Sequence, residues 1–279
     1  MTQSDWAYAS GKYAGDENFP VGSFLLRRGH RSAVALYYRF ARFSDDIADH
    51  GGLAAADKIK KLRYLDDALC GRHYHEVAEP VRLMMIERGI PLRHARDLLV
   101  AFQLDATKRR YRDWADLRHY CLHSAAPVGR FVLDLHGEES ALYGSSDALC
   151  NALQVINHIQ DCVKDYRVLH RIYMPSVWSR RAGADEKALL AGRADRAWRQ
   201  VFDEVLQHVE VWLDEAAVLS TAVQSRRLSM EVAVVYAVAR RLVKALRSEH
   251  PLVKNIALSR WAYAGCFVEG VLRGRRRVT

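Results

Sequence analysis

The chain has 279 residues and a formal net charge of +9, and half of its residues are hydrophobic. This composition excludes a largely disordered chain. The longest apolar run, from Val232 to Ala239, is far shorter than the roughly 20 residues that a bilayer span needs. The N-terminal residues lack the apolar core of a signal peptide. We therefore expect a globular, cytoplasmic protein.

The excess of positive charge fits nucleic acid, an anionic membrane or a polyanionic small substrate. The densest basic run, Arg273 to Arg277, has no interleaved aromatic residues, so we expect no nucleic-acid partner. This run is either a solvated tail or a contact with the inner face of a membrane, and the sequence leaves both open. The five cysteines are odd in number and form no C-x-x-C pair, which indicates reduced thiols.

Apolar residues at helical spacing predict ten helical segments, and no run alternates as a half-buried strand would. Pro127 and Gly129 predict a break in the fifth segment, which Gly137 closes. In chain order the segments cover residues 23–50, 53–70, 78–89, 91–108, 114–136, 146–169, 184–191, 194–219, 226–248 and 251–272.

The chain shows no internal repeat and no low-complexity segment that would separate two domains. We expect a single all-α domain over residues 1–279. Only residues 1–15 and 273–279 are expected to be loosely ordered.

One group of polar residues lies in the first segment. Tyr38, Arg42, Asp45 and Asp49 are spaced by 4, 3 and 4 residues, so they share one helix face, and Asp46 lies beside them. Asp45 and Asp49 lie roughly 6 Å apart along the helix axis, a separation that two carboxylates can close around a hard cation. This face is therefore a candidate half of a metal site.

A second group has the same pattern. Gln154, Asn157, Asp161 and Asp165 again share one face, with two carboxylates four residues apart. A single D-x-x-x-D on a helix is usually an ordinary solvent-facing pair. Here the flanking positions are apolar, and the faces carry Tyr, Arg, Gln and Asn, so we expect buried carboxylates that need cations. The two helices are interpreted as matching halves of one site.

These motifs resemble those of the squalene/phytoene synthase family. The segments DDIAD and NHIQDCVKD resemble its two aspartate motifs. YCLHSAAPVG, from Tyr120 to Gly129, resembles its tyrosine-containing segment, and RIYMP, from Arg171 to Pro175, its Arg-x-Tyr-x-Pro segment. The likeness covers about residues 16–175. The last hundred residues carry no motif that we can match.

The resemblance implies an isoprenoid-synthase helical bundle with a central apolar cavity and Mg²⁺ as cofactor. It implies Mg²⁺ ligands at Asp45, Asp46, Asp49, Asn157, Asp161 and Asp165, of which the four motif aspartates, Asp45, Asp49, Asp161 and Asp165, act in catalysis together with Tyr120. It implies an isoprenoid diphosphate substrate held by Phe19, Tyr38, Arg42, Gln154, Asn157, Gln160, Lys164, Arg171 and Tyr173.

Within the family, DENFPVG, SAAPVG and Gln160 resemble the bacterial hydroxysqualene synthases of hopanoid pathways, whereas condensing relatives usually have Arg at the position of Gln160. The expected reaction is ionisation of presqualene diphosphate, rearrangement and capture by water to give hydroxysqualene. One alternative is head-to-head condensation of two prenyl diphosphates, and another is a non-catalytic assembly protein. The resemblance also implies coupling to a presqualene diphosphate synthase and to an oxidoreductase that processes hydroxysqualene.

Overall fold

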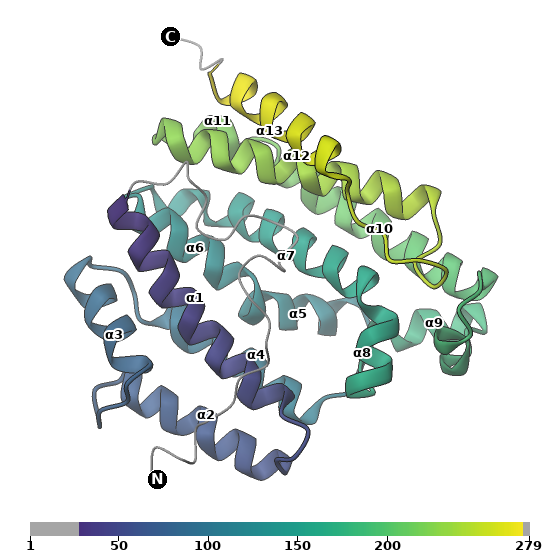
Figure 1. Cartoon of the computed structure of the whole chain (residues 1–279), viewed down its shortest axis with the longest axis horizontal. Helices are drawn as coiled ribbons and strands as arrows, with labels where there is room; N and C mark the ends of the chain where they lie inside the picture. Colours follow the sequence, from purple (N-terminus) through teal and green to yellow (C-terminus); the bar gives the residue numbers. More distant parts are fainter. Residues whose placement is uncertain (1–27, 276–279) are drawn as a thin grey trace. The chain divides into compact units, whose positions relative to one another are not determined.

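The computed structural model describes residues 28–275, which are mainly helical (Figure 1). The all-α prediction is confirmed. Residues 1–15 and 276–279, expected to be loosely ordered, lie outside the described residues, whereas 273–275 belong to the last helix. By its internal contacts the chain divides after Thr107 into two compact units. The single-domain expectation stays a prediction.

The first unit is a group of four helices in which α1 packs against the other three. Its core consists of apolar residues at helical spacing, among them Phe40, Ile47, Leu62, Leu65 and Leu98. The second, third and fourth helices agree with the predicted segments to within three residues, and the predicted start of the first lies outside the described residues. The helices are α1 (Arg28–Asp49), α2 (Ala55–Leu69), α3 (Ala78–Glu87) and α4 (Arg93–Thr107).

The second unit contains the remaining helices and one short parallel strand pair. Its central helix α7 packs against α5, α6, α10 and α12. The elements are β1 (Arg110–Tyr111), α5 (Trp114–Ser124), α6 (Ala126–Leu135), η3 (Ser140–Leu142), α7 (Tyr143–Gln160), α8 (Cys162–Leu169), β2 (Ile172–Pro175), α9 (Ser176–Ala182), η4 (Glu186–Leu190), α10 (Arg196–Ala216), α11 (Leu219–Ala222), α12 (Arg226–Ser248) and α13 (Arg260–Arg275).

The predicted break near Pro127 is confirmed. Helix α5 ends at Ser124 and α6 begins at Ala126, with Pro127 in its first turn, where its missing N–H leaves no hydrogen bond unmade. Helix α6 ends at Leu135, and Gly137 follows with a φ of 71°, a left-handed conformation that favours glycine.

The structure corrects the sequence prediction at three places. Strands β1 and β2 pair although no strand was predicted, because segments of two and four residues are too short to show alternation. The predicted helix 146–169 is divided at Asp161 into α7 and α8. The last helix begins at Arg260 and not at residue 251, because Leu252 and Ile256 lie buried in an irregular connection that follows Pro251.

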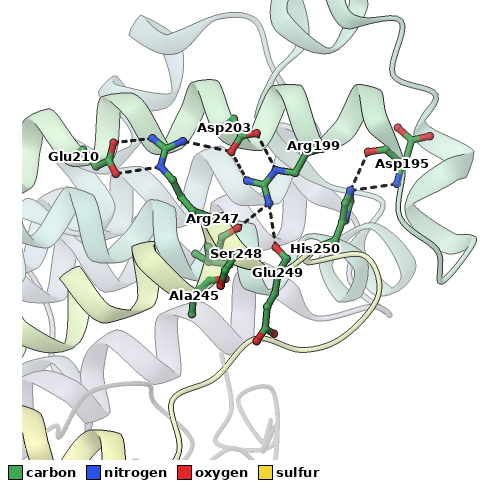
Figure 2. A network of polar contacts seen from close by, with 10 residues as sticks. Asp195, Arg199, Asp203, Glu210, Ala245, Arg247, Ser248, Glu249 and His250 are labelled. Atoms are coloured by element: carbon green, nitrogen blue, oxygen red, sulfur yellow. Dashed lines mark hydrogen bonds and ion pairs between the residues drawn. The ribbon is translucent and has the colours of Figure 1, made fainter.

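Helix α10 packs against α7, and its buried face carries large apolar residues that include Trp198, Phe202 and Leu213. An ion-pair network joins α10 to the end of α12 (Figure 2). Arg199 donates hydrogen bonds to the carbonyls of Leu246 and Glu249, which lie at the C-terminus of α12. A cation at this end of a helix satisfies the terminal carbonyls and interacts favourably with the helix dipole. The network therefore fixes the point where the connection to α13 leaves α12.

Candidate active site

The first acidic face lies on α1. Tyr38, Arg42, Asp45 and Asp49 share this helix, and each of them is partly exposed, whereas the opposite face of α1 is buried. Ser44 belongs to that buried face and donates its hydroxyl hydrogen bond to the Phe40 carbonyl, 2.9 Å away. The helix therefore turns its apolar side to its own unit and leaves the acidic side partly accessible, so the carboxylates are only partly buried and not buried as we expected.

Arg42 pairs with two of the acids on this face. Its Nη1 lies 2.8 Å from Asp45 Oδ2 and its Nη2 lies 2.7 Å from Asp46 Oδ1. The three side chains are 18%, 28% and 10% exposed, so the charges are partly screened from water. Burial opposes the charged form of Arg42, but the attraction of Asp45 and Asp46 outweighs it, and the pKa of Arg42 is raised. Arg42 is a built-in counter-ion for these two carboxylates.

A lysine from the next helix stabilises the end of α1. The buried Lys58 of α2 donates from Nζ to the Ala48 carbonyl, 2.7 Å away, in the last turn of α1. A charged donor at a helix C-terminus satisfies a carbonyl that has no partner within the helix. Lys58 thereby fixes the turn that carries Asp49. The sequence gives no signal for this contact, because it depends on how α2 packs.

The second acidic face lies where α7 meets α8. Asp161 stands at the junction, but its backbone N–H still reaches the Asn157 carbonyl, and the Asp165 N–H reaches the Asp161 carbonyl, both at 2.8 Å. Hydrogen bonds four residues apart thus continue through the junction, so the predicted common face is preserved. Gln154, Asn157, Asp161 and Asp165 are all partly exposed, and Lys164 is exposed beside them.

Gln160 turns away from this acidic face. It is 8% exposed, and its Nε2 donates a hydrogen bond to the Ile256 carbonyl in the connection between α12 and α13. A buried carbonyl without a donor would destabilise the fold, so the amide satisfies a structural need. The connection between α12 and α13 is therefore bound to Gln160, the residue that precedes Asp161.

Behind the second acidic face lies a buried aromatic cluster. Strand pairing brings Tyr111 of β1 beside Tyr173 of β2, with ring centroids 5.2 Å apart, and Tyr120 of α5 lies 5.3 Å from Tyr173. Arg171, only 2% exposed, donates from Nη1 to the Tyr173 hydroxyl at 2.9 Å, and its guanidinium lies 5.7 Å from the Tyr173 ring centroid. The cluster gathers the family-like Tyr120, Arg171 and Tyr173.

His158 of α7 completes the cluster. Its ring stacks on Tyr173 with centroids 3.5 Å apart, and its Nε2 lies 3.2 Å from Gln154 Nε2, which identifies this ring nitrogen as the acceptor. Burial, helped by the nearby Arg171 charge, lowers the pKa of His158 to about 3. His158 is therefore neutral at physiological pH and is a packed member of the aromatic cluster.

Most of the predicted site residues lie near other predicted site residues of the same unit. Arg171 and Tyr173 lie with Tyr120, and the acids lie on the two predicted faces. Phe19 lies outside the described residues. Tyr111 also belongs to the cluster, and only the strand pairing shows this.

The donor set of these faces suits Mg²⁺, which prefers carboxylate oxygens and amide carbonyls. Within residues 28–275 no three or more His, Cys, Asp or Glu side chains gather closely enough to hold a metal ion by themselves. Mg²⁺ sites that use substrate phosphates commonly take only one or two carboxylates from a protein. The residues present therefore fit a metal that shares its coordination with a diphosphate.

The squalene/phytoene synthase family model matches residues 13–262. The chain belongs to the squalene/phytoene synthase family. Hydroxysqualene synthase of Rhodopseudomonas palustris is 42% identical over 250 residues, covering 89% of this chain and 86% of the relative. Hydroxysqualene synthase of Sinorhizobium fredii is 40% identical over 245 residues, covering 88% and 84%. The protein is thus an enzyme of a family that processes isoprenoid diphosphates.

Solved structures of family members have the same fold. Squalene synthase HpnC from Alicyclobacillus acidocaldarius gives a TM-score of 0.73 at 28% identity, covering 84% of this chain and 90% of that one. A dehydrosqualene synthase gives a TM-score of 0.79 at 20% identity, covering 91% and 90%. The isoprenoid-synthase helical fold expected from the motifs is therefore confirmed.

Proposed function

We propose that the enzyme converts presqualene diphosphate to hydroxysqualene and diphosphate. The observation that carries this proposal is the identity of 40% or more to hydroxysqualene synthases over nearly nine-tenths of the chain. Both aspartate motifs, which such a reaction would need, are present in full.

We assign the metal ligands to the acidic faces, each of which would hold Mg²⁺ against a substrate diphosphate. Bound Mg²⁺ neutralises the negative charge that grows on the leaving group. Arg42 and Lys164 donate hydrogen bonds to phosphate oxygens. The proposed ligands are Asp45, Asp46, Asp49, Asn157, Asp161 and Asp165.

The aromatic cluster serves the cationic half of the reaction. Electron-rich ring faces stabilise positive charge, and Tyr120 and Tyr173 offer such faces in a site from which water is largely excluded. His158 adds no competing charge because its low pKa keeps it neutral. Arg171 holds the Tyr173 ring through the hydroxyl hydrogen bond.

Product analysis tests this function. Purified enzyme with Mg²⁺, presqualene diphosphate and ¹⁸O-labelled water should give hydroxysqualene that carries the label, with or without NADPH. Farnesyl diphosphate alone should give little product. Formation of presqualene diphosphate or a hydrocarbon from prenyl diphosphates would establish the condensing alternative, and absence of turnover on every diphosphate would favour a non-catalytic assembly role.

Asp161→Asn should abolish turnover and leave the helical content unchanged, because it removes a metal ligand and also removes like-charge repulsion. Asp214→Asn is the matched control, since Asp214 is a 74% exposed acid of α10 whose side chain pairs, within residues 28–275, with the surface residue Arg240. Its turnover should equal that of the parent enzyme. Loss of fold in Asp161→Asn would instead assign a structural role to that acid.

We further propose a cytoplasmic enzyme with peripheral contact to the inner face of an anionic membrane. None of the helices within residues 28–275 has the length and apolar character to span a bilayer. Trp261, Val268 and Leu272 of α13 lie on one helix face and are 87%, 56% and 52% exposed, and the exposed Lys254 and Arg260 precede them.

Vesicles test this contact. The enzyme should sediment with vesicles that contain anionic lipid and not with neutral ones, and Trp261→Ser should weaken sedimentation. Equal sedimentation of the parent enzyme and the Trp261→Ser variant would refute α13 as the contact.

The substrate would come from a presqualene diphosphate synthase, and the product would pass to an oxidoreductase.

A further inference from the structure

A polar stripe runs along one side of α7, a largely buried helix. Asp147, Asn151, Gln154 and His158 follow one another at spacings of 4, 3 and 4 residues, so they share a face, and the stripe continues to Asp161. A buried apolar helix does not need such a stripe for folding, because each buried polar group costs stability unless it is hydrogen-bonded.

The two ends of this stripe are satisfied by contacts within the second unit. Arg130 of α6 binds Asp147 through Nε, 2.8 Å from Oδ1, and through Nη2, 2.5 Å from Oδ2. At the other end Gln154 donates to His158. The residue between these two ends, Asn151, has neither of these partners.

Asn151 occupies that middle position. It is 3% exposed, and its buried Oδ1 accepts no hydrogen bond from any residue in the described part of the chain. Ser124 Oγ, at the end of α5 in the same unit, is also buried and makes no hydrogen bond within residues 28–275. Buried polar atoms of this kind usually bind an ordered water, which needs two to four polar partners.

The packing of α5 and α6 against α7 brings Ser124 near the level of Asn151. Tyr120 lies against His158, with ring centroids 5.8 Å apart, whereas Gly129 lies against Ser146 and Cys150. Residue numbers rise along α5 and α6 in the direction in which they fall along α7, so these helices run antiparallel to α7. Ser124, between Tyr120 and Gly129, therefore lies level with residues 151–154 of α7.

We propose that Asn151 and Ser124 hold the water molecule that captures the carbocation. This inference rests on the proposed function. As the C–O bond of the substrate breaks, its electron pair leaves with the diphosphate. After rearrangement, a lone pair of the held water forms the new C–O bond, and the proton of the resulting oxonium passes to the departing diphosphate. Asn151 accepts a hydrogen bond from the water and transfers no proton, so both residues are positioning residues.

The test uses Asn151→Leu, which keeps the branched outline and the number of heavy atoms of the side chain, and Ser124→Ala. The matched control is Ser146→Ala, a buried serine on the side of α7 that faces α6. Each variant receives presqualene diphosphate and Mg²⁺ in ¹⁸O-labelled water, and two quantities are measured: diphosphate release and the share of labelled alcohol, with its stereoisomers, among the products. Thermal unfolding is recorded beside them.

Asn151→Leu should release diphosphate at a rate close to that of the parent, while the share of the single alcohol falls by about tenfold, the factor that one ordinary hydrogen bond carries. Hydrocarbons formed by proton loss, or mixed alcohols, should replace it. The variant should also unfold at a temperature no lower than the parent, because an unsatisfied buried amide is removed.

An unchanged product in Asn151→Leu and Ser124→Ala would overturn the water site, and so would an equal change in Ser146→Ala. A parent enzyme that makes no alcohol would instead refute the proposed function, so the two failures are distinguishable.

Discussion

Replacement of Gly129 by alanine should show how closely α6 must approach α7. A Cβ at this position would lie 2.3 Å from Ser146 Oγ and 2.7 Å from Cys150 Sγ, whereas ordinary contacts are 3.4–4 Å. Such overpacking costs about 1–3 kcal/mol. The better helix propensity of alanine returns about 1 kcal/mol. We therefore expect Gly129→Ala to lower the free energy of unfolding by about 0–2 kcal/mol.

The same substitution should change sign when the two facing atoms are removed. In a Ser146→Ala, Cys150→Ala background the Cβ of residue 146 is the nearest recorded atom, at 3.6 Å, which is an ordinary contact. Gly129→Ala should then stabilise the protein by up to about 1 kcal/mol, the propensity gain alone.

Urea unfolding of the four proteins measures both effects, provided that the m-values agree, and each kcal/mol corresponds to about 2–4 °C in Tm for a unit of this size. Turnover should fall in the single variant and recover in the triple variant, because α7 carries the second acidic face. Equal destabilisation in both backgrounds would refute the close approach of α6 as the reason for glycine.

Two further predictions concern the Gln160 contact beside the second acidic face and the metal site. Gln160→Glu should destabilise the enzyme by about 1–3 kcal/mol and Gln160→Ala by less, as urea unfolding can measure, because a carboxylate would oppose the Ile256 carbonyl that now accepts a hydrogen bond. Equal effects would show that this bond contributes little. Mg²⁺ should raise Tm only when diphosphate is also present, since neither completes the coordination shell alone, and equal stabilisation by Ca²⁺ without diphosphate would contradict a shared site.

The features that the sequence predicts depend on neighbours along the chain. Helix periodicity places Asp45 four residues from Asp49, and the common face follows from 3.6 residues per turn. The same reasoning holds for Asp161 and Asp165, because hydrogen bonds continue through the junction of α7 and α8. Pro127 acts on its own turn, so the break beside it was also predictable.

The features that the sequence does not predict depend on residues far apart in the chain. Strands β1 and β2 are too short for a pattern, yet their pairing brings Tyr111 to Tyr173. Lys58 reaches the end of α1 only because α2 packs there. Nothing in the local sequence shows which carbonyl or carboxylate such a side chain will meet.

Gln160 shows why residue type alone leaves a role undecided. From the sequence, its importance lies in the charge that it lacks, since condensing relatives usually have Arg there. In the structure its amide has a second reason to be present, the hydrogen bond to the Ile256 carbonyl. An arginine at this position would still have donors for that carbonyl, but it would bring a buried charge next to Asp161. The absence of a charge and the amide hydrogen bond therefore both favour glutamine at this position. Separate measurements of turnover and of stability are needed to tell the two reasons apart.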